Sequence, residues 1–232
     1  MNSPSSQESN NPPSLQARKQ QLVRDAIWDA ATDLFAVKGF DETTVEDIAE
    51  AAGVSRRSFF RYFASKNDLM AHGMVNYGAE LTAAIEACPE SYSLAEVFRE
   101  TVRHVARKSA ANPRARTILA IVTKYPAARA AELSRFAEVQ DLVAKAYSRR
   151  SRNRGESELT ARLLAGLTLQ VTGITVRWWF ERGQPQITDA VDQAMATLDR
   201  LLCENTGPGK RRRRKGSPAR RPSVRIRSDQ ST

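Results

Sequence analysis

The chain has few of the residues that carry catalysis, metal binding or covalent cross-linking. Its 232 residues include two cysteines and two histidines. Cys88 and Cys203 are too few for a disulfide framework, which indicates a reducing compartment, and we expect both to act as small buried apolar side chains. His72 and His104 fall on different predicted helices, and no HExxH, CxxC or Walker-type loop occurs. We therefore expect no catalytic residues, no metal site and no cofactor.

Long apolar runs and strand-like alternation are also missing. No apolar run reaches the roughly 18 residues that a bilayer span needs. The N-terminal segment MNSPSSQESNNPPS is polar and does not have the basic-then-apolar pattern of a secretory signal. A hydrophobic content of 41% is ordinary for a soluble globular protein. These features predict an all-α, cytoplasmic protein with no membrane partner.

Positive charge is abundant but unevenly placed. The net charge is +10, and residues 208–232 hold ten basic residues and one acid, a net charge of +9 that leaves +1 for residues 1–207. Positive charge alone is therefore no evidence that the body of the chain binds DNA. The tail is either a solvated extension or a second, nonspecific contact to phosphates.

Apolar spacing and helix stop signals predict about nine helices and two domains. Residues 1–14 and 205–232 have too little apolar content to fold and should be disordered. We expect a compact N-terminal helical domain over residues 16–80 and a larger helical domain over residues 81–204. The expected helices are 16–38, 44–52, 56–63, 65–88, 93–111, 114–124, 126–152, 156–182 and 187–203.

Residues 43–69, TTVEDIAEAAGVSRRSFFRYFASKNDL, have the pattern of a helix-turn-helix. Ala49 is small enough for the second helix to approach, and Gly53 supplies the left-handed backbone that ends the first helix. Val54 can pack into the angle between the helices, and Ser55 offers a hydroxyl that caps the second helix. The second helix is rich in arginine, so it fits a DNA major groove.

The candidate DNA-binding residues surround this second helix. Arg56, Arg57 and Arg61 fan over its exposed side, and arginine can bond guanine through two hydrogen bonds. Phe59 and Phe63, four residues apart, should face the core. The other candidates for contact with bases, sugars or phosphates are polar or aromatic: Thr43, Thr44, Ser55, Ser58, Phe60, Tyr62 and Lys66.

The segment resembles the DNA-binding part of the TetR family of bacterial transcriptional regulators. It shares that family's frequent pattern at Val54, Ser55, Tyr62, Phe63, Lys66 and Leu69. It departs from the pattern at Arg57, where glycine is usual, at Ser58, where threonine is usual, and at Phe60, where tyrosine is usual. The resemblance implies a three-helix DNA-binding domain, a helical ligand-binding body and a homodimer built on the last two helices. It also implies a repressor that binds a double-stranded operator and leaves it when a ligand binds.

The resemblance extends more loosely to the body. Residues 112–125, Pro126 and the following helix resemble the family's C-terminal type that binds acyl-CoA-like ligands, which implies a small hydrophobic or acyl-type ligand. Tyr125, Phe136 and Trp178 are candidates for the ligand pocket, although aromatic residues at helical spacing also occur in ordinary cores. The dimer interface that the family implies would contain the apolar residues of the last two helices: Leu163, Leu167, Val171, Ile174, Leu198 and Leu201.

Two other functions remain open at this point. A nucleoid-type protein would bind DNA without sequence preference or ligand control, and a steep salt dependence would mark it. A helical enzyme acting on an acyl thioester would leave the helix-turn-helix unexplained.

Overall fold

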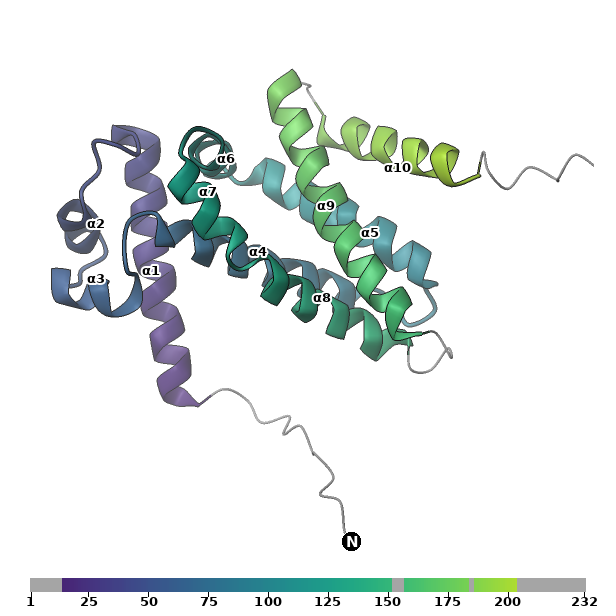
Figure 1. Ribbon diagram of the computed structural model, residues 1–232, viewed down its shortest axis with the longest axis horizontal. Helices are drawn as coiled ribbons and strands as arrows, with labels where there is room; N and C mark the ends of the chain where they lie inside the picture. The colour runs from purple at the N-terminus through teal and green to yellow at the C-terminus, as the bar shows by residue number, and fades with distance from the viewer. Residues whose placement is uncertain (1–13, 152–156, 184–185, 204–232) are drawn as a thin grey trace, which may run out of the picture. The chain divides into compact units, whose positions relative to one another are not determined.

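The computed structural model describes residues 14–151, 157–183 and 186–203 (Figure 1). These residues form helices joined by turns and contain no strand, which confirms the all-α class. The chain divides into a unit of residues 1–196, whose packing is described below, and a unit of residues 197–232. The helices are α1 (Leu15–Lys38), α2 (Val45–Ala51), α3 (Arg56–Tyr62), α4 (Asp68–Ala87), α5 (Leu94–Ala111), α6 (Ala115–Lys124), α7 (Pro126–Leu133), α8 (Phe136–Ser151), α9 (Glu158–Arg182) and α10 (Ile187–Cys203).

Hydroxyl caps and glycines set several of the helix ends at the predicted residues. The side chains of Thr44, Ser55 and Ser93 accept hydrogen bonds from the first turns of α2, α3 and α5. Gly39 and Gly53 follow α1 and α2 with φ angles of +88° and +66°, a region that favours glycine. Short local signals therefore fix this part of the fold.

The predicted helix 126–152 is divided in the structure into α7 and α8, so ten helices are described instead of about nine. Ser134 still donates from its amide to the carbonyl of Ala130, at 3.0 Å, but the amide of Arg135 bonds to Glu132, three residues back. This tighter turn ends α7. A second difference is that α4 begins at Asp68 rather than at Ser65.

A first apolar core lies among α1, α2, α3 and the start of α4. Phe59 and Ile27 are fully buried in it. Helices α6 and α7 complete this core with Ile121, Val122 and Ala128. The N-terminal helices are therefore packed against part of the body.

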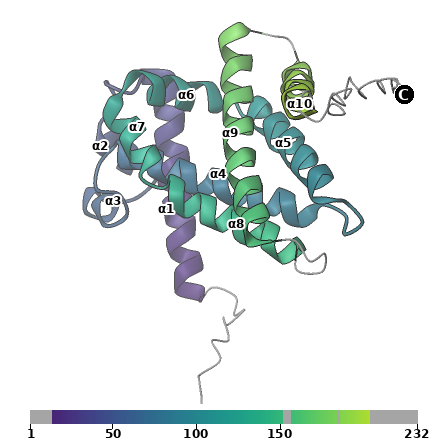
Figure 2. The same ribbon diagram turned by 45° about the vertical axis from the view of Figure 1, so that its right-hand side comes forward.

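A second core lies among α4, α5, α8 and α9, where α9 packs against α5 and α8 (Figure 2). At Gly78 on α4, a Cβ atom would lie 2.4 Å from Cγ1 of Val139, so glycine allows α4 and α8 to approach closely. Tyr147 is fully buried, and its hydroxyl lies 2.8 Å from that of Thr168. The predicted domain boundary at residue 80 falls within α4, which contributes to both cores.

Some expectations concern residues beyond the described ranges. The segments expected to be disordered lie outside them, except for Ser14, which caps α1. Helix α9 is the single described helix whose length and composition would suit a membrane span. One side of α9 is nevertheless part of the second core, through Ala161, Ala165 and Leu169.

Candidate nucleic-acid interface

Helices α2 and α3 form the predicted helix-turn-helix. The amide of Val54 donates to the carbonyl of Ala49 at 2.9 Å, which closes the turn around Gly53. Thr44 and Asp47 form a reciprocal capping box at the start of α2. Hydrogen bonds from the Thr44 amide and from Lys38 lower the pKa of Asp47 to about 2, so this cap keeps its charge at neutral pH.

The aromatic residues of α3, together with Phe63 that caps its C-terminal end, separate into an inner and an outer set. Phe59 is 0% exposed and Phe63 is 2% exposed, as predicted, and their ring centroids lie 5.8 Å apart. Phe60 points outward, with 45% of its surface exposed. Because Phe59 holds one side of α3 against the core, the opposite side is presented outward.

The exposed side of α3 carries three arginines in different situations. Arg56 pairs with Glu46 of α2, at 3.0 Å, and its guanidinium lies 5.6 Å from the ring centroid of Phe60. Arg57 is exposed, and no hydrogen bond or ion pair of its side chain is found in the described part of the chain. Arg61 lies against the ring of Tyr62. Arg57 is therefore the cation best able to meet a base without breaking an existing contact.

Hydroxyl groups and a further arginine complete the edges of α3. The hydroxyls of Ser55 and Ser58 lie 3.1 Å apart. Arg24 of α1 lies with its guanidinium 5.8 Å from the ring centroid of Tyr62, and Arg61 lies 5.0 Å from it. Sequence reasoning missed Arg24, because it lies more than 30 residues from Tyr62 and no short motif links the two.

Thr43 does not occupy the position expected of a phosphate contact. It is 1% exposed, and its hydroxyl donates to the carbonyl of Gly39 at 2.7 Å. Thr44 is exposed as expected, although its hydroxyl caps α2. Of the two adjacent threonines, only Thr44 lies where a phosphate could reach it.

Lys66 also differs from the expectation of a free phosphate-binding cation. Its ammonium group donates to the carbonyls of Phe40 and Thr43, the latter at 2.9 Å, and lies 4.4 Å from the ring centroid of Phe40. Partial burial lowers the pKa of Lys66, against the opposing effect of Asp41. The side chain thus joins the segment before α4 to the segment before α2.

Replacing Lys66 by methionine should lower the free energy of unfolding by about 2 kcal/mol, since bonds from a charged donor to the carbonyls of Phe40, Asp41 and Thr43 are lost. Urea denaturation of the purified protein measures this. Lys145→Met on the exposed side of α8 is the control, and it should change stability little. If Lys66→Met keeps full stability but loses DNA affinity, the phosphate contact predicted from sequence is the correct role.

The three candidates for the ligand pocket are not brought together. Tyr125 packs against the first core, with its ring centroid 4.7 Å from that of Phe40, and its hydroxyl donates to Asp41 at 2.5 Å. Phe136 packs against the second core. Trp178 is half-buried near the end of α9, under the guanidinium of Arg182. Tyr125 belongs to the contact between body and N-terminal helices rather than to a shared cavity with the other two.

A second polar contact links the same parts. Arg114, just before α6, bonds Asp33 through two guanidinium nitrogens at 2.6 and 2.8 Å and Asp29 through the third at 2.6 Å. Both aspartates lie on α1. The sequence contains no signal for this pairing, because more than 80 residues separate the partners.

The candidate dimer residues of α9 lie largely on one exposed side. Leu163, Leu167 and Ile174 are 58%, 43% and 63% exposed, and Val171 is half-buried. On α10, within the second unit, Leu198 is half-buried and Leu201 is 61% exposed. Large apolar side chains that remain this exposed are typical of a surface that another molecule covers.

Comparison with known proteins gives two family matches. Residues 27–72 match the family model described as bacterial regulatory proteins, tetR family, and residues 92–202 match the model described as MftR C-terminal domain. Together they cover both helices of the candidate interface and most of the body.

Individual relatives are similar over nearly their whole length. One is the mycofactocin biosynthesis transcriptional regulator MftR of Mycobacterium tuberculosis, 27% identical over 79% of this chain and 95% of that protein. Another is the HTH-type transcriptional regulator TcmR of Streptomyces glaucescens, 26% identical over 87% and 92%. The crystal structure of the Thermus thermophilus TetR family repressor FadR with lauroyl-CoA matches at a TM-score of 0.53 and 26% identity, over 84% of this chain and 99% of that one.

Proposed function

The chain belongs to the TetR family of bacterial regulatory proteins, and we propose that it is a homodimeric repressor that binds its operator through α3. A small hydrophobic or acyl-type ligand, bound in the helical body, releases the operator. The protein acts in the cytoplasm, its partners are double-stranded DNA, a second copy of the chain and this ligand, and we assign it no enzymatic activity.

The exposed side of α3 is the observation that carries this proposal. Arg57 extends from it without a partner in the described residues, next to Arg56 and Arg61, while buried Phe59 fixes the orientation of the helix. A helix of this size enters a major groove with its first turns against the bases. Arg57 therefore reads a base, and Thr44 and Tyr62 lie at the flanks, where phosphates run.

The apolar side of α9 supports the dimer. A Cβ atom on exposed Gly173 would meet no atom of the described residues within 4 Å, so none of these residues requires glycine there. A partner helix that approaches closely would require it. Two copies related by a twofold axis place two α3 helices on half-sites about 34–36 Å apart.

An unpaired polar atom in the body supports a bound ligand. The indole nitrogen of Trp179 on α9 is buried and has no hydrogen-bond partner among the described residues. A polar group of a ligand would satisfy such an atom, whose burial without a partner is costly. The lauroyl-CoA in the FadR complex supports an acyl-type molecule as that ligand.

The contacts between body and N-terminal helices give the ligand a way to act on DNA binding. Arg114 holds Asp29 and Asp33 of α1, and Tyr125 holds Asp41 between α1 and α2. A ligand that favours a different arrangement of α6 and α7 changes these contacts and moves α3. Coupling free energies of about 1–3 kcal/mol are typical for such linked sites.

Selecting a bound operator from random duplex DNA tests the proposal. We expect a palindromic site, and we expect fatty acyl-CoA esters of graded chain length to release it in fluorescence anisotropy. Binding without sequence preference and with a steep salt dependence would instead identify a nucleoid-type protein.

Replacing Arg57 by alanine should change the preferred base at one position of each half-site and reduce discrimination there by about 1–3 kcal/mol. Repeating the selection with the variant measures this. Lys145→Ala, which removes an equal charge from the exposed side of α8, should leave the preference unchanged. Uniform weakening over all sequences would mean that Arg57 contacts phosphate and reads no base.

A further inference from the structure

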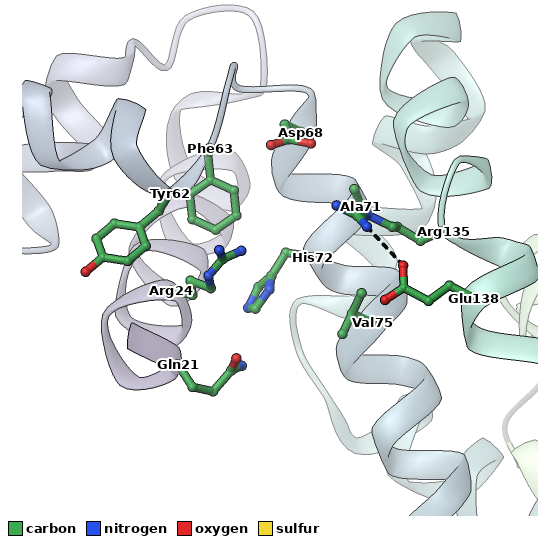
Figure 3. A pocket seen from close by; sticks show the side chains of 10 residues that line it. All are labelled: Gln21, Arg24, Tyr62, Phe63, Asp68, Ala71, His72, Val75, Arg135 and Glu138. Atoms are coloured by element: carbon green, nitrogen blue, oxygen red, sulfur yellow. Dashed lines mark hydrogen bonds and ion pairs between the residues drawn. The ribbon is translucent and has the colours of Figure 1, made fainter. Parts of the chain in front are cut away.

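A cavity of about 400 Å³ lies where α1, α3 and α4 approach the first turn of α8. Figure 3 shows the side chains around it, with Arg24 and His72 pointing toward one another from α1 and α4. It is separate from the exposed side of α3 that carries Arg57 and from the buried indole nitrogen of Trp179 in the body. Tyr62, the last residue of α3, forms part of its wall.

The wall holds two cations, Arg24 and Arg135, and two carboxylates, Asp68 and Glu138, so its formal charge is balanced. Arg135 pairs with Glu138, at 2.9 Å, and the carboxylate of Asp68 accepts a hydrogen bond from the amide of Ala64 at 3.1 Å. Arg24 has no ion pair among the described residues and only lies against the ring of Tyr62. A negatively charged group entering the cavity therefore finds a guanidinium that is free to bind it.

The remaining wall is suited to a flat molecule. The rings of Tyr62 and Phe63 line it, together with the apolar side chains of Ala71 and Val75. Nε2 of His72 lies 3.0 Å from the carboxylate of Asp25, and burial lowers the pKa of His72, so this ring adds an aromatic surface to the wall. These rings offer flat surfaces beside Arg24, the guanidinium of the wall that has no ion pair among the described residues.

We propose that this cavity binds a small planar organic anion, with its carboxylate or equivalent group on Arg24 and its ring against Tyr62 and Phe63. The volume suits a single-ring molecule. The bound molecule contacts both the end of α3 and the first turn of α8, so it acts at the joint between the DNA-reading helices and the body. The site does not depend on the operator or on the ligand of the body.

Benzoate is the probe, and the full chain is titrated with it by calorimetry and by saturation-transfer NMR, without DNA. We expect saturable binding of benzoate and none of benzamide, which has the same shape but no charge. Arg24→Gln should weaken benzoate binding at least roughly tenfold, since a charge-assisted hydrogen bond is lost. Lys19→Gln, which removes another exposed charge of α1, should leave it unchanged. Val75→Phe fills the cavity without changing its charge and should also abolish binding.

Three outcomes overturn the proposal. The first is the absence of saturable benzoate binding to the wild-type chain. The second is equal binding by the wild type and by folded Arg24→Gln, with folding checked by thermal denaturation. The third is that Arg24→Gln weakens operator binding but leaves benzoate binding unchanged. Arg24 would then be a contact to DNA phosphate.

Discussion

Replacing Leu167 by glutamate should convert the proposed dimer into a monomer and weaken operator binding by roughly 100-fold or more. Leu167 lies on α9 between Leu163 and Ile174, on the exposed apolar side of the helix. A carboxylate buried there without a partner costs about 3–5 kcal/mol. A monomer carries one α3 helix and can hold only one half-site at a time. Sedimentation velocity at micromolar concentration measures the first effect, and anisotropy with the selected operator measures the second.

Leu133→Glu is the matched control for this variant. Leu133 is 51% exposed at the end of α7, so the same substitution meets solvent there and should leave both association and DNA binding intact. Neither glutamate should unfold the chain, because each side chain starts on the surface. A folded Leu167→Glu variant that remains dimeric would place the interface elsewhere.

The sequence was sufficient where structure depends on neighbouring residues. Gly53 needs a left-handed backbone, Ser55 caps the helix that follows it, and Phe59 and Phe63 share one side of that helix. Each of these properties acts within about one helical turn. The helix-turn-helix could therefore be predicted nearly residue by residue.

The sequence was insufficient where side chains meet partners far along the chain. Lys66 and Thr43 have the chemistry of phosphate contacts, yet Lys66 is occupied by carbonyls more than 20 residues away and Thr43 is buried. Tyr125 has the composition of a pocket residue, yet it bonds Asp41. The type of a residue limits the interactions that its side chain can make. Which of these interactions forms depends on the residues that pack against it in the folded chain.

The sequence at the break between α7 and α8 contains none of the residues that usually end a helix. Ser134 and Arg135 are neither glycine nor proline, and helical sequence continues on both sides. The helices on either side of the break pack in different cores, because Ala128 of α7 lies in the first core and Val139 of α8 lies in the second.

Replacing Phe59 by alanine should lower the free energy of unfolding by about 3–5 kcal/mol, because a fully buried ring is removed from the first core. Phe60→Ala removes the same atoms from the next position, where 45% of the residue is exposed, and should cost less than about 1 kcal/mol. Urea denaturation of both variants measures the difference.

Operator binding by Phe59→Ala and Phe60→Ala distinguishes a residue that holds α3 in place from a residue that contacts DNA. Phe59→Ala leaves α3 without the side chain that fixes its inner side, so operator affinity should fall even where the rest of the chain remains folded. Phe60→Ala should keep α3 in place, and its affinity should change only by the contact that the ring itself makes with a thymine methyl or the sugar backbone. Circular dichroism at the temperature of the binding assay shows whether each variant is folded, so a loss of affinity caused by unfolding is distinguished from the loss of a DNA contact. Equal stability losses in the two variants would contradict the inward position of Phe59, on which the orientation of the arginine side of α3 depends.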